Sequence, residues 1–131
     1  MNNIPRAQLS ILLVCPTGLA QMSLVTAVNA FSWATVVARA KDVDSALAMT
    51  RDFTPDVLLA DAYILGDLVS GFLRQIHEIH PKMLLVVLAG TSLQKKRFLG
   101  EGADIVLDYS NMIRQFPQVL SLAQSRANEY E

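Results

Sequence analysis

Asp61 is the acidic residue with the clearest potential for chemistry, because it ends the apolar run "VLLAD" at residues 57–61. A carboxylate at the end of a buried strand can act as a nucleophile or bind a ligand. It can also stay unreacted, accepting hydrogen bonds from the backbone N–H groups of the following turn. The residues that surround Asp61 decide between these two interpretations.

Three other groups of residues are candidates for chemistry or binding. Cys15 ends another apolar run; redox chemistry there would need a lowered thiol pKa, and no Lys, Arg or His is adjacent in sequence to lower it. His77 and His80 are three residues apart, and metal binding would need further ligands, so a solvated position is favoured. The basic cluster "QKKR" at 94–97 is either a solvated face or a contact site.

The composition limits the classes of function. With 131 residues the chain has the size of one domain. Its 11 Lys and Arg against 12 Asp and Glu, and its 52% hydrophobic content, argue against direct nucleic-acid binding and favour a protein or small-ligand partner. The single cysteine excludes an internal disulfide, and the apolar runs are too short for a signal peptide or a membrane span. We therefore expect a cytoplasmic protein.

Short runs rich in Val, Ile and Leu alternate with longer amphipathic stretches, which is the pattern of a parallel sheet covered on both faces by helices. Leu68, Phe72, Ile76 and Ile79, for example, recur at helical spacing. Pro117 predicts a kink or a late start in the last helix. The predicted strands are 9–15, 35–40, 57–61, 83–89 and 104–107, and the predicted helices are 19–31, 44–53, 68–79, 93–101 and 111–126.

These alternating units predict a flavodoxin-like (βα)5 fold: a doubly wound parallel sheet with strand order 2-1-3-4-5 and helices on both faces. We expect one domain over residues 1–131, with a core of about 9–125. Ligands bind such sheets at the C-terminal ends of the strands, near the switch between strands one and three. The residues expected to line this crevice are Cys15, Pro16, Thr17, Asp61, Ala89, Gly90, Thr91, Asp108 and Tyr109.

Over about residues 9–125 the chain resembles the receiver domain of bacterial two-component response regulators. The spacing from "ILLVCPTG" (11–18) to "PDVLLAD" (55–61) is similar to the family's spacing from its first strand to its phosphoacceptor aspartate. The segment "GADIVLDYS" (102–110) is similar to the family's Gly-Ala-Asp turn and fifth strand. The resemblance implies a phosphorelay signalling domain rather than an enzyme, and it puts Asp61 at the phosphoacceptor position.

Several positions depart from the family pattern. Cys15 and Pro16 stand where the family has two acidic residues that hold Mg²⁺. Ala89 replaces the Thr or Ser that bonds the phosphoryl group, and Tyr109 replaces the Lys that pairs with its oxygens. Val106 takes the place of an aromatic switch residue. Mg²⁺ prefers oxygen ligands, and phosphoryl transfer requires its charge to be neutralised, so we expect no metal, no cofactor and no catalytic residue.

These departures favour a pseudo-receiver: a receiver-like domain that works through protein–protein interaction without Mg²⁺-dependent phosphorylation. The alternative is a phosphorylatable receiver that uses Asp61 in an unusual site. A third hypothesis is a ligand or redox sensor at the altered crevice, in which Cys15 would take part.

The resemblance also implies where a protein partner or a second copy would bind. The family's common contact surface corresponds to the helix at 93–101, the strand at 104–107 and the helix at 111–126. In this chain that surface would include Lys95, Lys96, Arg97, Tyr109 and Met112. The identity of the partner, the oligomeric state and the presence of a following output domain stay open.

Overall fold

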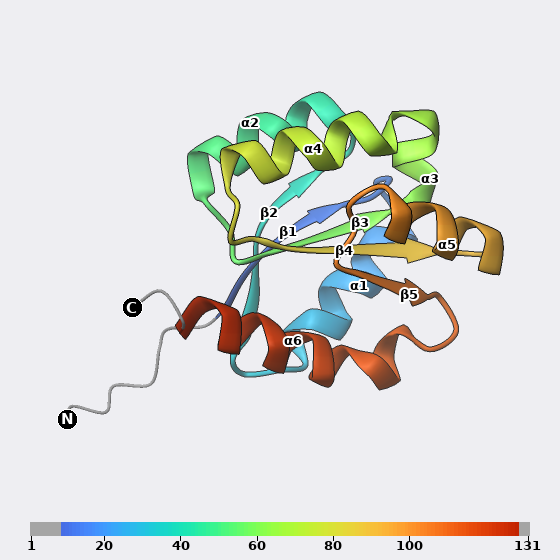
Figure 1. Cartoon of the computed structure of the whole chain (residues 1–131). Coiled ribbons are helices and arrows are strands. Elements are labelled where there is room, and N and C mark those ends of the chain that lie inside the picture. The colour runs from blue at the N-terminus through green and yellow to red at the C-terminus, as the bar shows by residue number, and fades with distance from the viewer. Residues whose placement is uncertain (1–8, 129–131) are drawn as a thin grey trace.

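A five-stranded parallel sheet lies at the centre of the computed structural model, which describes residues 9–128 (Figure 1). Along the sheet the strands follow the order β2-β1-β3-β4-β5, so the predicted order is confirmed. β3 and β4 are buried at every residue, as strands covered on both faces must be. The strands are β1 (Leu9–Val14), β2 (Ala34–Ala40), β3 (Val57–Asp61), β4 (Leu84–Ala89) and β5 (Ile105–Asp108).

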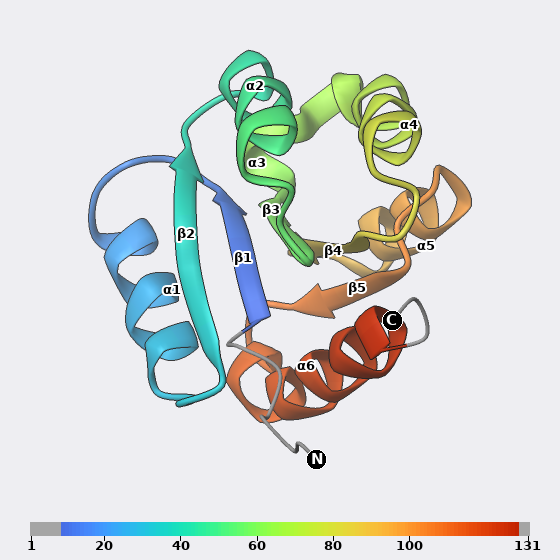
Figure 2. The same cartoon turned by 90° about the vertical axis from the view of Figure 1, so that its left-hand side faces the viewer.

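Helices cover both faces of the sheet. Figure 2 shows α1 (Leu19–Asn29) and α6 (Met112–Asn128) on one face, and α2 (Val43–Phe53), α3 (Ala62–Leu65), α4 (Val69–Ile79) and α5 (Ser92–Gly100) on the other. A 3-10 turn, η1 (Gly66–Leu68), joins α3 to α4. In residues 9–128 no helix has both the length and the apolar content to cross a bilayer.

Two hydrophobic cores fill the space between the sheet and its helices. Val28 of α1 and Phe116 of α6 belong to the first core, together with inward-facing residues of β1, β3 and β4. Phe72 of α4 and Phe98 of α5 belong to the second, on the opposite face. Each of these four side chains is at most 2% exposed, so both cores are closed to water.

The predicted strands and helices lie within two residues of the observed ones, apart from two differences. The short α3 and the η1 turn were not predicted, because four residues are too few for a helical period to show. Pro117 predicted a kink or a late start in the last helix, and the late start is wrong, since α6 begins at Met112 with Pro117 inside it. Proline there removes only the hydrogen bond to the carbonyl of Ile113, and both residues are exposed, so water can hydrate that carbonyl.

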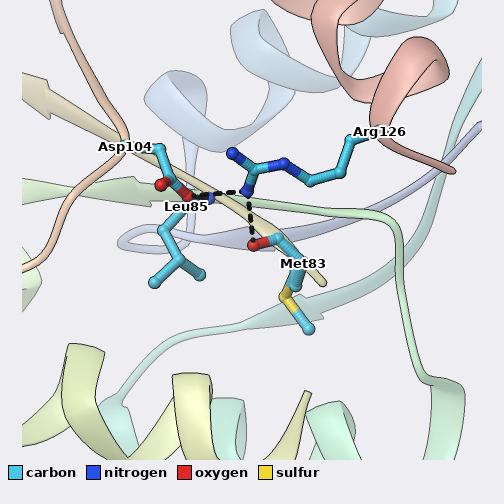
Figure 3. Close-up of polar contacts among 4 residues, drawn as sticks. All are labelled: Met83, Leu85, Asp104 and Arg126. Atoms are coloured by element: carbon cyan, nitrogen blue, oxygen red, sulfur yellow. Dashed lines mark hydrogen bonds and ion pairs between the residues drawn. The ribbon is translucent and has the colours of Figure 1, made fainter. Parts of the chain in front are cut away.

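Aspartates tie neighbouring strands together at the N-terminal edge of the sheet. Asp56, one residue before β3, accepts a hydrogen bond from the Ser10 N–H of β1 at 2.9 Å. Asp104, one residue before β5, accepts from the Leu85 N–H of β4 at 2.8 Å. Figure 3 shows that Arg126, near the end of α6, reaches the same carboxylate at 3.2 Å and the Met83 carbonyl oxygen at 3.4 Å. The end of α6 is thereby held against β4 and β5.

The edge contacts predict an order of stabilities. Asp104→Ala should lower the free energy of unfolding by about 1–3 kcal/mol, because it leaves the buried Leu85 N–H without its side-chain acceptor. Arg126→Ala should cost about 1 kcal/mol or less, because its ion pair with Asp104 is partly exposed. Asp104→Asn keeps an acceptor oxygen and should lose less than Asp104→Ala. Urea denaturation measures all three, and a larger loss for Arg126→Ala than for Asp104→Ala would contradict this account.

Candidate functional site

The C-terminal ends of four strands meet at the opposite edge of the sheet. The register pairs Val14 of β1 with Ala60, Asp61 of β3 with Leu88, and Ala89 of β4 with Asp108 of β5. Four residues of the predicted crevice lie at or just beyond these strand ends: Cys15, Asp61, Ala89 and Tyr109. The strand order therefore places these four residues at the same edge of the sheet.

Asp61 is nearly buried, with 7% of its surface exposed, and it links the end of β3 to the start of α3. Its side-chain Oδ1 accepts a hydrogen bond from the backbone N–H of Tyr63 at 3.0 Å, which makes Asp61 the N-cap of that short helix. This is the backbone contact predicted for an unreacted carboxylate. The same oxygen also accepts a hydrogen bond from the hydroxyl group of Tyr109.

Tyr109 extends from the end of β5 across the end of β4 to reach Asp61 on β3. Its ring lies beside Gly90, because a side-chain carbon built on Gly90 would be 3.6 Å from the ring atom Cε2. Burial raises the pKa of the Tyr109 hydroxyl, and the hydrogen bond to Asp61 and the charge of that carboxylate raise it further. The phenol therefore stays protonated at neutral pH and remains a hydrogen-bond donor to Asp61.

Cys15, Pro16 and Ala89 bring little polar chemistry to this edge. The Cys15 side chain is fully buried, and burial raises the pKa of its thiol; the charge of Asp61 acts in the same direction, while a hydrogen bond with Gln21 opposes it. A thiol with a raised pKa is a poor nucleophile and a poor redox group. Proline has no side-chain donor or acceptor, and Ala89 is 3% exposed with an apolar side chain.

The side-chain carboxylates at the ends of β3 and β5 are those of Asp61 and Asp108, and Mg²⁺ binds carboxylates, carbonyls and water. Asp61 offers a carboxylate whose Oδ1 already accepts two hydrogen bonds. Asp108 is exposed, and its Oδ1 accepts from the Ser110 N–H at 2.8 Å and hydroxyl at 2.7 Å, contacts that lower the pKa of Asp108. Within residues 9–128 no group of three or more His, Cys, Asp and Glu side chains could hold a metal ion.

The residues predicted to form a contact surface do not all share one face. Lys95 lines a shallow hollow of about 140 Å³ between α5 and α6, together with Asp108. Arg97 turns the other way and forms ion pairs at 3.5 Å with Asp67 of η1 and with Glu101. The helical rotation of 100° per residue separates these neighbours in sequence. Lys96 is exposed between them.

Met112 does not belong to the contact surface, so this part of the prediction is wrong. It is only 9% exposed and packs into the core between α6 and the sheet. The following residue, Ile113, is 69% exposed. The sequence alone did not distinguish which of these two adjacent apolar residues faces inward.

The hydrogen bond between Tyr109 and Asp61 is the feature of the site that sequence reasoning missed. The sequence placed Tyr109 in the crevice, at the position of the family's lysine, without predicting this contact. A phenol at the end of β5, close to a lone buried carboxylate, is the signal that could have predicted the contact, because a buried tyrosine hydroxyl usually finds a hydrogen-bond partner. The sequence did not show that the side chain spans β4.

Comparisons with solved structures identify proteins that share this fold. No protein-family model matches the sequence, and no curated protein matches it significantly. The structure is similar to a LuxR-family two-component response regulator from Aurantimonas sp. SI85-9A1, with a TM-score of 0.79, 18% identity, and 91% of this chain and 86% of that chain covered. A response regulator receiver domain from Clostridium thermocellum gives a TM-score of 0.79 at 18% identity, with 94% and 99% covered. A CheY-like receiver domain protein from Methanospirillum hungatei JF-1 gives 0.74 at 20% identity, with 94% and 99% covered.

The raised pKa of Tyr109 predicts a loss of stability at high pH. The protonated phenol stabilises the fold fully below the ordinary tyrosine pKa of about 10, and this contribution is lost as the pH rises from there towards the higher folded-state value. Above pH ~10 the free energy of unfolding should therefore fall more steeply for the native chain than for Tyr109→Phe. Urea denaturation at a series of pH values measures both slopes.

Asp61→Asn is the matched control for that experiment, because it keeps an acceptor oxygen but removes the charge that raises the Tyr109 pKa. Above pH ~10 the fall of its free energy of unfolding with pH should be intermediate between those of the native chain and Tyr109→Phe. Equal slopes for the native chain and Tyr109→Phe would contradict the contact.

Proposed function

From the fold that this chain shares with response-regulator receiver domains, we propose that it is an atypical receiver. It works in two-component signalling by binding a protein partner, without Mg²⁺-dependent phosphorylation of Asp61. The observation that supports this proposal most strongly is the hydrogen bond from the Tyr109 hydroxyl to the carboxylate at the phosphoacceptor position.

The chemistry of phosphoryl transfer explains why this contact matters. The attacking carboxylate oxygen must be free, and cations must neutralise the charge that develops on the phosphoryl oxygens. Here Oδ1, one of the two oxygens of the Asp61 carboxylate, accepts hydrogen bonds from the Tyr63 N–H and the Tyr109 hydroxyl, so these contacts hold the carboxylate in one orientation. Tyr109 is also a neutral group where the resemblance implies a lysine. An acyl phosphate on Asp61 would carry about two negative charges next to a phenol whose pKa is already raised.

The residues that would transmit a phosphorylation signal also differ. Ala89 and Val106 are 3% and 6% exposed, and neither has a polar group. The resemblance implies a hydroxyl and an aromatic ring at these two positions. Without them, a phosphoryl group on Asp61 would lack the partners that reposition β5 and α5. This supports a domain with one constitutive conformation of its contact surface.

The partner surface that we propose is centred on α5. Its sequence, SLQKKRFLG, has three basic residues and no acidic one. Leu93 in its first turn is 79% exposed, and Tyr109 beyond β5 is 47% exposed. An exposed tyrosine on the same part of the molecule as Lys95 and Lys96 would suit a partner that presents an apolar contact with acidic groups around it. We define the partner surface as Lys95, Lys96 and Tyr109.

A charge-reversal experiment tests the partner surface. The tagged chain is used to retain proteins from extracts of its native host, and the double variant Lys95→Glu and Lys96→Glu is compared with the native chain by quantitative mass spectrometry. The amount of the specific partner that the double variant retains should be at least tenfold lower than for the native chain, since each reversed charge repels acidic groups on the partner protein.

Arg51→Glu in α2 is the matched control, because Arg51 is also an exposed basic residue on a helix but is not part of the partner surface. It should retain the same partner as the native chain. Equal retention by the native chain and the double variant would exclude this surface, as would a loss that Arg51→Glu also causes.

A further inference from the structure

A pocket of about 830 Å³ opens at the N-terminal edge of the sheet, opposite the edge that holds Asp61. α4 and the turn after it form one wall, the turn between α5 and β5 forms another, and the end of α6 closes a third side. α4 and α6 cover opposite faces of the sheet, so the pocket joins the two faces around the sheet edge (Figure 2). We name it the edge pocket; its charged and titratable residues are Arg74, His77, Lys82, Glu101, Asp104 and Arg126.

Both carboxylates of the edge pocket are already paired with arginines. Asp104 forms an ion pair with Arg126 at 3.2 Å. Glu101 forms one at 3.5 Å with Arg97, which lies outside the pocket. The positive charges of α4 and of the turn after it are therefore in excess, and the pocket as a whole favours an anionic ligand.

The donors that an anion would meet come from two sides of the edge pocket. On one side Arg74 and His77 are exposed and lie three residues apart on α4, so they share one face of that helix. Neither side chain forms a hydrogen bond or an ion pair within the described part of the chain. On the other side Arg126 uses only Nη1 for its contacts with Asp104 and Met83 (Figure 3). Its Nη2 therefore remains a donor for a ligand.

The helix dipole explains some of these basic residues but not all of them. Partial negative charge at the C-terminal ends of α4 and α6 stabilises cations in the last turn, where His77 and Arg126 lie. Arg74 lies more than one turn before the end of α4 at Ile79, where this effect has fallen off. Its charge is therefore balanced neither by the helix end nor by a carboxylate of the described residues, and it is available to a ligand.

We infer that the edge pocket binds a nucleoside diphosphate. Arginine binds phosphoryl oxygens through charge-assisted and often bidentate hydrogen bonds. Arg74 and Arg126, on two sides of the pocket, suit a ligand with two phosphoryl groups. A volume of about 830 Å³ is far more than a phosphate ion needs, and it lies in the range of pockets that hold organic ligands. The ligand should therefore have an organic part as well as its phosphates.

The rest of the edge pocket suits the nucleoside. Asp104 accepts its hydrogen bonds from Leu85 and Arg126 through Oδ2, so Oδ1 remains an acceptor for N–H or O–H groups of a base or a ribose. Pro81 adds an apolar surface for a base ring. Gly100 leaves the wall open, since a side-chain carbon built on it would meet nothing within 4 Å. This inference stands independently of the proposed function, because no residue at the Asp61 edge takes part in it.

Isothermal titration calorimetry in magnesium-free buffer tests the edge pocket, with ADP, GDP and inorganic pyrophosphate as the probes. The native chain should bind at least one of the two nucleotides at one site per chain. Arg74→Gln and His77→Ala should each raise its Kd about tenfold or more, because each removes a donor to the phosphates. Both positions are exposed on a helix, and Gln and Ala are good helix formers, so the fold should be preserved, which circular dichroism checks.

Arg114→Gln is the matched control, since Arg114 is also an exposed arginine on a helix but lies at the opposite end of α6 from Arg126. It should leave the Kd unchanged. The inference is overturned if neither nucleotide binds, or if either pocket variant binds as tightly as the native chain. It is also overturned if Arg114→Gln weakens binding equally. Pyrophosphate that binds as tightly as the nucleotides would overturn it too, because the nucleoside would then contribute nothing.

Discussion

The carboxylate of Asp61 lies almost buried at the end of β3, and the rest of the site is arranged around the way in which that charge is satisfied. A buried carboxylate is costly unless hydrogen-bond donors surround it. Asp61 receives one donor from the backbone of the turn that follows it and another from the hydroxyl of Tyr109, two strands away. The second contact crosses the end of β4 and links β3 directly with β5.

The nature of this donor limits the chemistry that is available. A lysine and a bound Mg²⁺ bring positive charge, which stabilises additional negative charge at the same position. A phenol brings a hydrogen bond without a charge, so it satisfies one carboxylate but does not compensate for a phosphoryl group. Burial of Cys15 and the apolar side chain of Ala89 act in the same direction. These contacts support the proposal that the domain offers a fixed surface to other molecules.

The sequence predicted the fold well because its signals were local. Five apolar runs separated by amphipathic stretches specify the order of strands and helices, and the rules of parallel sheets then specify how these assemble. The short helix α3 was missed because its four residues contain no repeating pattern. The late start that Pro117 allowed for α6 did not occur, because proline at an exposed position in the second turn costs less than proline at a buried one.

The site was only partly predictable for a different reason. Sequence position identified Cys15, Asp61, Ala89 and Tyr109 as neighbours, since each follows a strand of known order. It did not reveal the direction in which the Tyr109 side chain extends, and it grouped Lys95 with Arg97 although the helix turns them to different sides. The direction of the Tyr109 side chain depends on packing between segments distant in sequence, which local patterns do not encode, whereas the separation of Lys95 from Arg97 follows from the helical rotation alone. Met112 and Ile113 illustrate the same limit on α6.

Incubation with Mg²⁺ and a small acyl phosphate, followed by intact-mass spectrometry, tests the central claim about Asp61 most directly. A receiver domain that keeps the acidic pair and the lysine serves as the positive control. The account predicts no phosphoryl addition to the native chain. It predicts none to Tyr109→Phe either, because removing the hydroxyl restores neither a metal ligand nor a cation. An added phosphoryl group on the native chain that Asp61→Asn abolishes would contradict the account.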